Sequence, residues 1–142
     1  MNRSVWVVDD EPLIRAAVIA VLSELGYETR GFANAEELYT ELVHGQERPQ
    51  LLVLDQMLPD EDGATIVRSL RERDEYRDIP IIFLTAVTEE QADRLEDLAP
   101  VVRKPFDFRD FVAAIEERLP PEPGSETDPE TPLSEAPEAA RP

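Results

Sequence analysis

Short apolar segments alternate with longer amphipathic ones along most of the chain. The short segments are rich in Val, Ile, Leu and aromatic residues, and they are 4–9, 27–32, 51–55, 79–85 and 100–104. The first, third and fourth are apolar almost throughout, which is typical of strands buried on both faces of a parallel sheet. The second alternates between polar and apolar residues, so we place it nearer an edge of the sheet.

Helical patterns lie between these segments and after the last of them. The first runs from Pro12 to Leu25, begins with proline in its first turn and stops at Gly26. Its predicted inward stripe is Ile14, Val18, Val21 and Leu25. Four later helices are expected to start at Asn34 with Glu37, at Asp62-Gly63, at Thr88 with Gln91, and at Asp107 with Asp110. The last has the predicted stripe Phe108, Phe111, Val112, Ile115 and Leu119, with Phe106 stapled against Phe111.

Strand and helix therefore alternate five times, which predicts an α/β fold with a doubly wound parallel five-stranded sheet. In such sheets the ligand site lies beyond the carboxyl ends of the strands. Polar side chains stand at four of those ends: Asp9 and Asp10, Asp55, Thr85, and Lys104. We expect these side chains to converge at one edge.

These residue types suit the transfer of a phosphoryl group. Oxygen ligands without Cys or His select a hard cation such as Mg²⁺ rather than Zn²⁺. Asp55 stands apart from the acidic pair and is the candidate nucleophile, because carboxylates can form acyl phosphates. Lys104 can neutralise phosphoryl oxygens, and the Thr85 hydroxyl can donate a hydrogen bond to one of them. The sequence thus predicts a phosphoryl-accepting site.

Four motifs, in their order along the chain, resemble the receiver domain of two-component response regulators. They are "VVDDEP", "LVLDQMLPDEDG", "FLTA" and "KPF". The resemblance covers residues 4–119. It implies a flavodoxin-like (βα)5 fold with strand order 2-1-3-4-5. It also implies phosphorylation of Asp55 by a sensor histidine kinase, a histidine phosphotransfer protein or a small donor such as acetyl phosphate. The domain would then catalyse its own phosphorylation and dephosphorylation, turn over no separate substrate, and signal through protein contacts.

The resemblance further implies a Mg²⁺ ion held by Asp10 and Asp55, by Asp9 through water, and by the backbone carbonyl of Met57. A cis peptide bond before Pro105 is typical of the family. Two features depart from the family pattern. Val101 stands where the family usually has an aromatic residue. The segment between Thr85 and Lys104 is short, which predicts that the fourth helix, or its link to the fifth strand, is truncated.

Charge and composition restrict the partners and the location. The formal net charge of −18 argues against DNA, RNA or an anionic membrane as a partner, because these attract Lys and Arg. No apolar run approaches the ~20 residues that a membrane span needs, and the N-terminus is too acidic for a signal peptide. The expected location is cytoplasmic. Cysteine is absent, so thiolate chemistry is absent as well.

Residues 120–142 are rich in proline and acids, with Leu133 as the only large apolar side chain. Such a segment cannot offset the entropy of ordering it, and we predict a disordered tail after a receiver domain of residues 1–119. No basic segment that could read DNA follows the domain. The chain is therefore expected to act as a CheY-like single-domain response regulator with an unknown output protein.

Simpler interpretations exist for each candidate residue taken alone. Asp9 and Asp10 could cap a helix, Asp55 could belong to a turn, and Lys104 could be a surface charge. Trp6 is expected in the core, Gly63 in the turn before the third helix, and His44 at a solvated helix end, away from the site. Only the combination favours phosphoryl transfer.

Two other functions compete with a phosphorylated receiver. A pseudo-receiver could dock partners without phosphorylation, which the complete residue set argues against and Val101 mildly favours. A Mg²⁺ phosphatase of the haloacid dehalogenase type would need acids spaced D-x-D on the first strand and a cap domain. Here the acids at 9 and 10 are adjacent, and the chain leaves no room for a cap.

Overall fold

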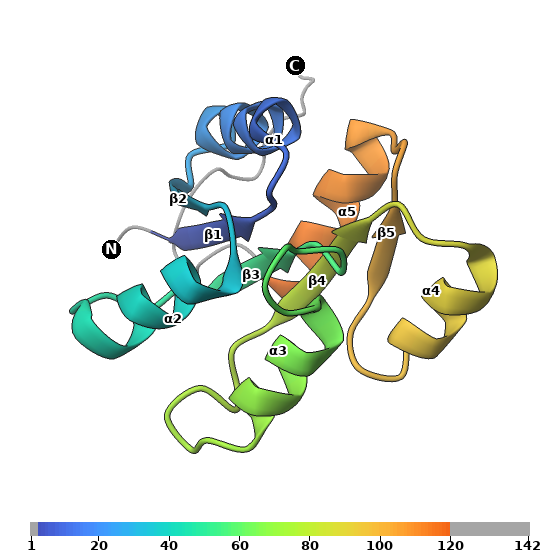
Figure 1. The fold of residues 1–142 in the computed structure, drawn as a ribbon. Helices are drawn as coiled ribbons and strands as arrows, with labels where there is room; N and C mark the ends of the chain where they lie inside the picture. The colour runs from blue at the N-terminus through green and yellow to red at the C-terminus, as the bar shows by residue number, and fades with distance from the viewer. Residues whose placement is uncertain (1–2, 120–142) are drawn as a thin grey trace.

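Five strands lie side by side in one parallel sheet in the computed structural model, which describes residues 3–119 (Figure 1). They are β1 (Ser4–Val8), β2 (Glu28–Phe32), β3 (Leu51–Leu54), β4 (Ile81–Thr85) and β5 (Val101–Arg103). Their order across the sheet is β2-β1-β3-β4-β5. The predicted α/β class, the strand order and the edge position of the second strand are confirmed. The tail predicted at 120–142 lies outside the described residues.

Helices cover both faces of the sheet (Figure 1). They are α1 (Pro12–Glu24), α2 (Ala35–His44), α3 (Gly63–Arg71), α4 (Glu89–Leu95) and α5 (Phe108–Arg118). Helices α1 and α5 share one apolar core with Val5 and Val7 of β1. Helices α2, α3 and α4 share the other core with Trp6 and Val8. Because successive strand residues point to opposite faces, double coverage explains why β1, β3 and β4 are apolar almost throughout.

Side-chain caps start the helices where the sequence predicts them. The Glu37 amide donates to the Asn34 carboxamide oxygen at 2.8 Å, and the Thr65 amide donates to Asp62 at 2.8 Å. Thr88 and Gln91 form a reciprocal capping box. Each cap satisfies an amide that the first turn would otherwise leave without a partner.

The inward faces of two helices differ from prediction. In α1 the buried residues are Val18 and Leu22, whereas Leu25 is 47% exposed. The buried residues are four positions apart, and Leu25 follows the last helical residue, Glu24, as the C-cap. In α5, Phe111 and Ile115 are buried, but Phe108 is 41% exposed because it lies in the first turn, at the rim of the sheet.

Other predictions about single elements are confirmed. The Phe106 ring meets Phe111 edge-on at 5.6 Å, as the predicted staple requires. Helix α4 is the shortest of the described helices at seven residues, and Trp6 is fully buried. Among residues 3–119, no helix is both long enough and apolar enough to cross a membrane.

Candidate functional site

The backbone of the sheet brings the predicted polar residues to one edge. The Asp9 amide donates to the Phe32 carbonyl at 3.0 Å, and the Asp55 amide donates to the Val8 carbonyl at 3.0 Å. The Lys104 amide donates to the Thr85 carbonyl at 2.9 Å. Each of these residues is therefore placed by strand pairing that continues just past the strand end. The convergence expected from the parallel topology is confirmed.

Lys104 lies at the centre of this edge and bridges three carboxylates. Its ammonium Nζ is 2.8 Å from Asp9 Oδ2, 3.3 Å from Asp55 Oδ2 and 3.3 Å from Glu11 Oε1. The Lys104 side chain is only 11% exposed. It is also the only lysine in the sequence, in which the other permanently charged cations are arginines. A compact ammonium can lie among several carboxylates in a way that a planar guanidinium cannot easily match.

Asp55 is buried and held at both carboxylate oxygens. Its Oδ1 accepts hydrogen bonds from the Thr85 hydroxyl at 2.7 Å and from the Met57 amide at 3.1 Å. Its Oδ2 faces Lys104. Thr85 is buried on β4, and its hydroxyl also accepts the Gln56 amide at 3.3 Å. The carboxylate that the sequence singled out as a nucleophile is therefore oriented by three donors.

Burial and charge shift two pKa values at this edge. Burial, reinforced by the charge of Asp55, raises the pKa of Asp9 above its ordinary value of 3.8, although hydrogen bonds from Lys104 and the Glu11 amide act against the shift. Burial alone would lower the pKa of Lys104. The hydrogen bond to Asp9 and the negative charges of Asp55 and Asp9 together outweigh burial, so the pKa of Lys104 lies above 10.5.

Asp9, Asp10 and Asp55 fit the needs of a divalent cation. Each offers a carboxylate oxygen, and these oxygens lie within 4.8 Å of one another. Mg²⁺ binds oxygen at about 2.1 Å, so ligands on opposite sides of one ion lie about 4.2 Å apart, and small side-chain movements bridge the difference. Asp10 is exposed while the other two are buried, which leaves one side of the cluster open to solvent. Met57 is 63% exposed.

Gln56, near the start of the loop between β3 and α3, also accepts hydrogen bonds from the residues at the loop's end. The Gly63 amide donates to the Gln56 carbonyl at 2.9 Å, and the Ala64 amide donates to the Gln56 side chain at 2.8 Å. Gly63 was predicted in the turn before the third helix, whereas it is the first residue of α3. A Cβ there would lie 2.6 Å from the Asp55 carbonyl oxygen, so close approach of two backbones is what requires glycine.

Sequence reasoning did not assign two residues that the structure places at the site. Glu11 supplies the third carboxylate on Lys104, and Arg15 donates to the Asp9 carbonyl at 2.7 Å. The only sequence signal for either was its nearness to the acidic pair, since Arg15 follows Glu11 by one helical turn. His44 lies exposed at the end of α2, as predicted.

Hydrogen bonds connect β5 to the segments on either side of α4. Val101 is half-buried, and its amide donates to the Glu96 carboxylate at 3.1 Å. Two residues later, the Arg103 side chain donates to the Val87 carbonyl at 3.0 Å and ties β5 to the loop after β4. The Lys104–Pro105 peptide bond is cis, as the resemblance implies.

Comparison with known proteins agrees with this geometry. The family model described as the response regulator receiver domain matches residues 5–116, nearly all of the described chain. The chain belongs to the response regulator receiver family. Receiver domains of response regulators partner with histidine kinases, and the present fold and acidic cluster are those of a receiver.

This receiver is similar in sequence to parts of two transcriptional regulatory proteins. It is 36% identical over 122 residues to the transcriptional regulatory protein GltR of Pseudomonas aeruginosa. The match covers 83% of this chain and 49% of GltR. It is 33% identical over 119 residues to the phosphate regulon transcriptional regulatory protein PhoB of the same organism, covering 81% of this chain and 51% of PhoB. The receiver thus spans about half the length of the curated relatives it matches.

Solved receiver structures share the fold. The response regulator TrrA of Thermotoga maritima, solved in complex with Mg(2+)-BeF, superimposes with a TM-score of 0.72 at 30% identity, covering 82% of this chain and 99% of TrrA. The BeF3-activated DrrB receiver domain gives a TM-score of 0.72 at 29% identity, covering 84% of this chain and 98% of DrrB.

Proposed function

We propose that this receiver accepts a phosphoryl group on Asp55 and signals the change to a partner protein. The donor is a phosphohistidine of a sensor kinase or of a histidine phosphotransfer protein, or a small acyl phosphate. The observation that carries the proposal is the buried Asp55 carboxylate, held by Thr85 and the Met57 amide and facing Lys104. The expected setting is the cytoplasm, where such kinases present their phosphohistidines.

Transfer of the phosphoryl group forms one bond to phosphorus and breaks another. A carboxylate oxygen of Asp55 attacks phosphorus, the bond from phosphorus to the donor breaks, and the donor keeps the electron pair. Imidazole leaves when the donor is phosphohistidine, and acetate leaves when it is acetyl phosphate. The product is an acyl phosphate on Asp55, and no redox partner or further reactant is needed.

The surrounding residues have distinct tasks in this proposal. Lys104 already lies within 3.3 Å of Asp55 and can offset the negative charge of the arriving phosphoryl oxygens. The Thr85 hydroxyl, now donating to Asp55, can donate to a phosphoryl oxygen after transfer. Asp10 and Asp55, Asp9 through water, and the Met57 carbonyl would hold Mg²⁺. When bound, Mg²⁺ supplies the positive charge that this acidic cluster otherwise obtains from Lys104 alone.

The decisive test is the intact mass of the protein after incubation with acetyl phosphate and Mg²⁺. We expect one phosphoryl adduct on the unmodified protein, none on Asp55→Ala, and none after chelation of Mg²⁺ with EDTA. Asp93→Ala serves as the control, because Asp93 is an exposed acid on α4 outside the cluster. An adduct that survives in Asp55→Ala would refute the assignment. The absence of any adduct, with the beryllofluoride complex also absent, would favour a docking module.

Exposed apolar side chains around the site suggest where a kinase docks. Leu13, in the first turn of α1, is 85% exposed, and Phe108, in the first turn of α5, is 41% exposed. Both helices begin at the edge of the sheet where Asp55 lies. We expect Leu13→Asp to slow transfer from a phosphorylated kinase about tenfold, since one lost apolar contact is worth about 1.4 kcal/mol.

Transfer from acetyl phosphate should be unchanged in Leu13→Asp, because a small donor needs no docking surface. The exposed Val43 lies in the last turn of α2, which leads into the amino end of β3, and it offers the control Val43→Asp. Equal rates for all three proteins with the phosphorylated kinase would exclude this surface as the docking site.

A further inference from the structure

Asp60 connects the loop that follows Asp55 to a different layer of the protein. Its Oδ1 accepts the Ala35 amide at 3.0 Å, and its Oδ2 accepts the Glu36 amide at 2.9 Å. These are the first two amides of α2, more than twenty positions earlier in the chain. Hydrogen bonds from these amides hold the pKa of Asp60 below its ordinary value of 3.8, so Asp60 is charged at neutral pH. Both oxygens of the carboxylate are therefore committed to this contact.

The contact between Asp60 and α2 fixes the loop to a helix that also has a cap of its own. Helix α2 already has its own cap, because Asn34 accepts the Glu37 amide. Its first turn also carries Glu36 and Glu37, which complement the positive end of the helix dipole. A further carboxylate at this position adds negative charge to a turn that is already acidic. Asp60 satisfies the Ala35 and Glu36 amides, and the loop gains a fixed point on a helix whose Ala35, Leu38 and Leu42 are buried.

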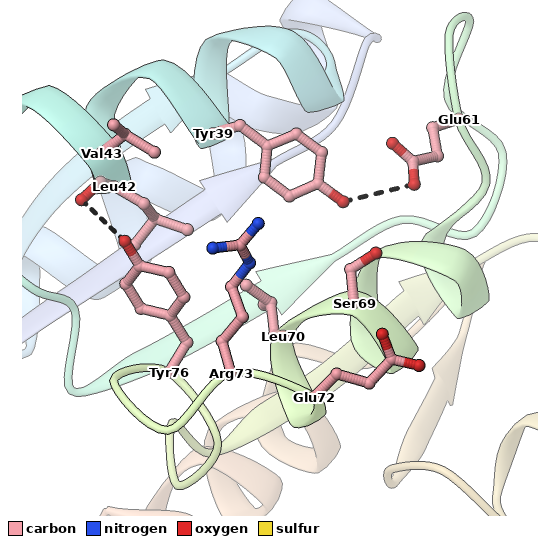
Figure 2. Close-up of a pocket in the computed structure, with 9 residues that line it drawn as sticks. All are labelled: Tyr39, Leu42, Val43, Glu61, Ser69, Leu70, Glu72, Arg73 and Tyr76. Atoms are coloured by element: carbon pink, nitrogen blue, oxygen red, sulfur yellow. Dashed lines mark hydrogen bonds between the residues drawn. The ribbon is translucent and has the colours of Figure 1, made fainter.

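The middle of the loop has few hydrogen bonds to other elements, although Leu58 packs against the core shared by α2, α3 and α4. Gln56 and Gly63 close its two ends, and the Met57 side chain is 63% exposed. Within the described chain, residues 57–61 bond to another element through Asp60 and, more weakly, through Glu61. Figure 2 shows the second contact, in which the Tyr39 hydroxyl on α2 points at the Glu61 carboxylate at 3.3 Å. The Asp60 contact lies in the first turn of α2 and the Glu61 contact lies one turn later, and Asp60 is the stronger because it uses two amide donors.

We propose that Asp60 is a positioning residue for the Mg²⁺ site, because it holds the loop containing Met57 against α2. This inference rests on the proposed function, in which the Met57 carbonyl is one of the ligands. Met57 is three residues from Asp60, and its amide donates to Asp55 Oδ1 at 3.1 Å. Movement of the loop would therefore displace the Met57 carbonyl and loosen one hydrogen bond to the Asp55 carboxylate. Removal of an outer-shell partner of a metal ligand typically weakens metal binding by about tenfold or more.

Three variants separate positioning of the loop from stability of the helix. Asp60→Ala removes both contacts to α2, and Asp60→Asn keeps one acceptor. Asn34→Ala removes a cap from the same turn of α2 without touching the loop, and it is the matched control. For each protein, the affinity for Mg²⁺ is measured by titrating magnesium chloride and following the amide signals of residues 56–63 by NMR. Hydrogen exchange of the same amides is measured in the metal-free protein.

Asp60→Ala is expected to weaken Mg²⁺ binding about tenfold and to speed exchange in the loop, with Asp60→Asn between it and the unmodified protein. Asn34→Ala should lower the melting temperature but leave Mg²⁺ affinity unchanged. Equal Mg²⁺ affinity in Asp60→Ala and Asn34→Ala would overturn the inference while leaving the proposed function intact. Failure of the unmodified protein to bind Mg²⁺ would overturn both, so the two failures are distinguishable.

Discussion

Lys104→Met is expected to slow phosphorylation of Asp55 by acetyl phosphate about a hundredfold, and to destabilise the metal-free protein by about 2 to 3 kcal/mol. The first effect follows because Lys104 is the one cation within reach of Asp55 among the described side chains. The second follows because Asp9 and Asp55, both buried, would lose the ammonium that faces them. A buried charge left without its partner costs more than the ion pair itself contributes.

Loss of Lys104 also removes a competitor for the carboxylates that would hold Mg²⁺. In the unmodified protein a metal ion must share Asp9 and Asp55 with Lys104, whereas in Lys104→Met the carboxylates have no competing cation. We therefore expect Mg²⁺ to stabilise Lys104→Met more than it stabilises the unmodified protein. Urea unfolding with and without Mg²⁺ measures both quantities. A smaller Mg²⁺ effect in the variant would contradict the assignment of these carboxylates to the metal.

The pH dependence and a control variant complete this test. Because the pKa of Lys104 is raised above 10.5 in the folded protein, its charge contributes stability below that pH and loses it as pH rises through the folded-state pKa. The stability difference between the two proteins should therefore shrink at strongly alkaline pH. Arg109→Met removes a cation whose side chain is 92% exposed, and it should change stability by less than about 1 kcal/mol.

Gly63→Ala is expected to destabilise the protein by about 2 kcal/mol and to impair phosphorylation, although local sequence rules predict the reverse. Gly63 begins α3 without positive φ, and alanine favours helix over glycine by about 1 kcal/mol. The added methyl group, however, would lie 2.6 Å from the Asp55 carbonyl oxygen and 3.0 Å from the Gln56 Cα. Those neighbours are backbone atoms beside the nucleophile, so they can yield only by moving Asp55.

Thr65→Ala is the control for this experiment, because Thr65 is exposed two residues later in α3 and its amide keeps the Asp62 cap. Urea unfolding gives the stability of each protein, and the mass assay with acetyl phosphate gives its phosphorylation. If Gly63→Ala were as stable as Thr65→Ala, the close contact between α3 and Asp55 would not constrain the site.

The helix starts and the convergence of the site could be derived from sequence because both depend on local rules. Asn34, Asp62 and Thr88 cap helices by bonding amides three residues ahead, a distance that sequence reports directly. Parallel strands all end at one edge, so a polar residue after an apolar run is placed by topology alone. The helical stripe was predicted less well, because in α1 the buried pair is Val18 and Leu22 and in α5 Phe108 is exposed. A 3.6-residue period leaves several apolar lines possible until the sheet selects one.

By itself, the sequence determined the α/β class, the order of the elements and the residues gathered at the carboxyl edge, because these follow from periodicity, caps and strand ends. Only the tertiary structure decided how those residues interact. Lys104 bridges Asp9, Asp55 and Glu11, Asp60 reaches across to α2, and Gly63 is required by the Asp55 carbonyl. Such contacts join residues 8 to 95 positions apart, and their distances depend on the packing of whole elements rather than on any local pattern.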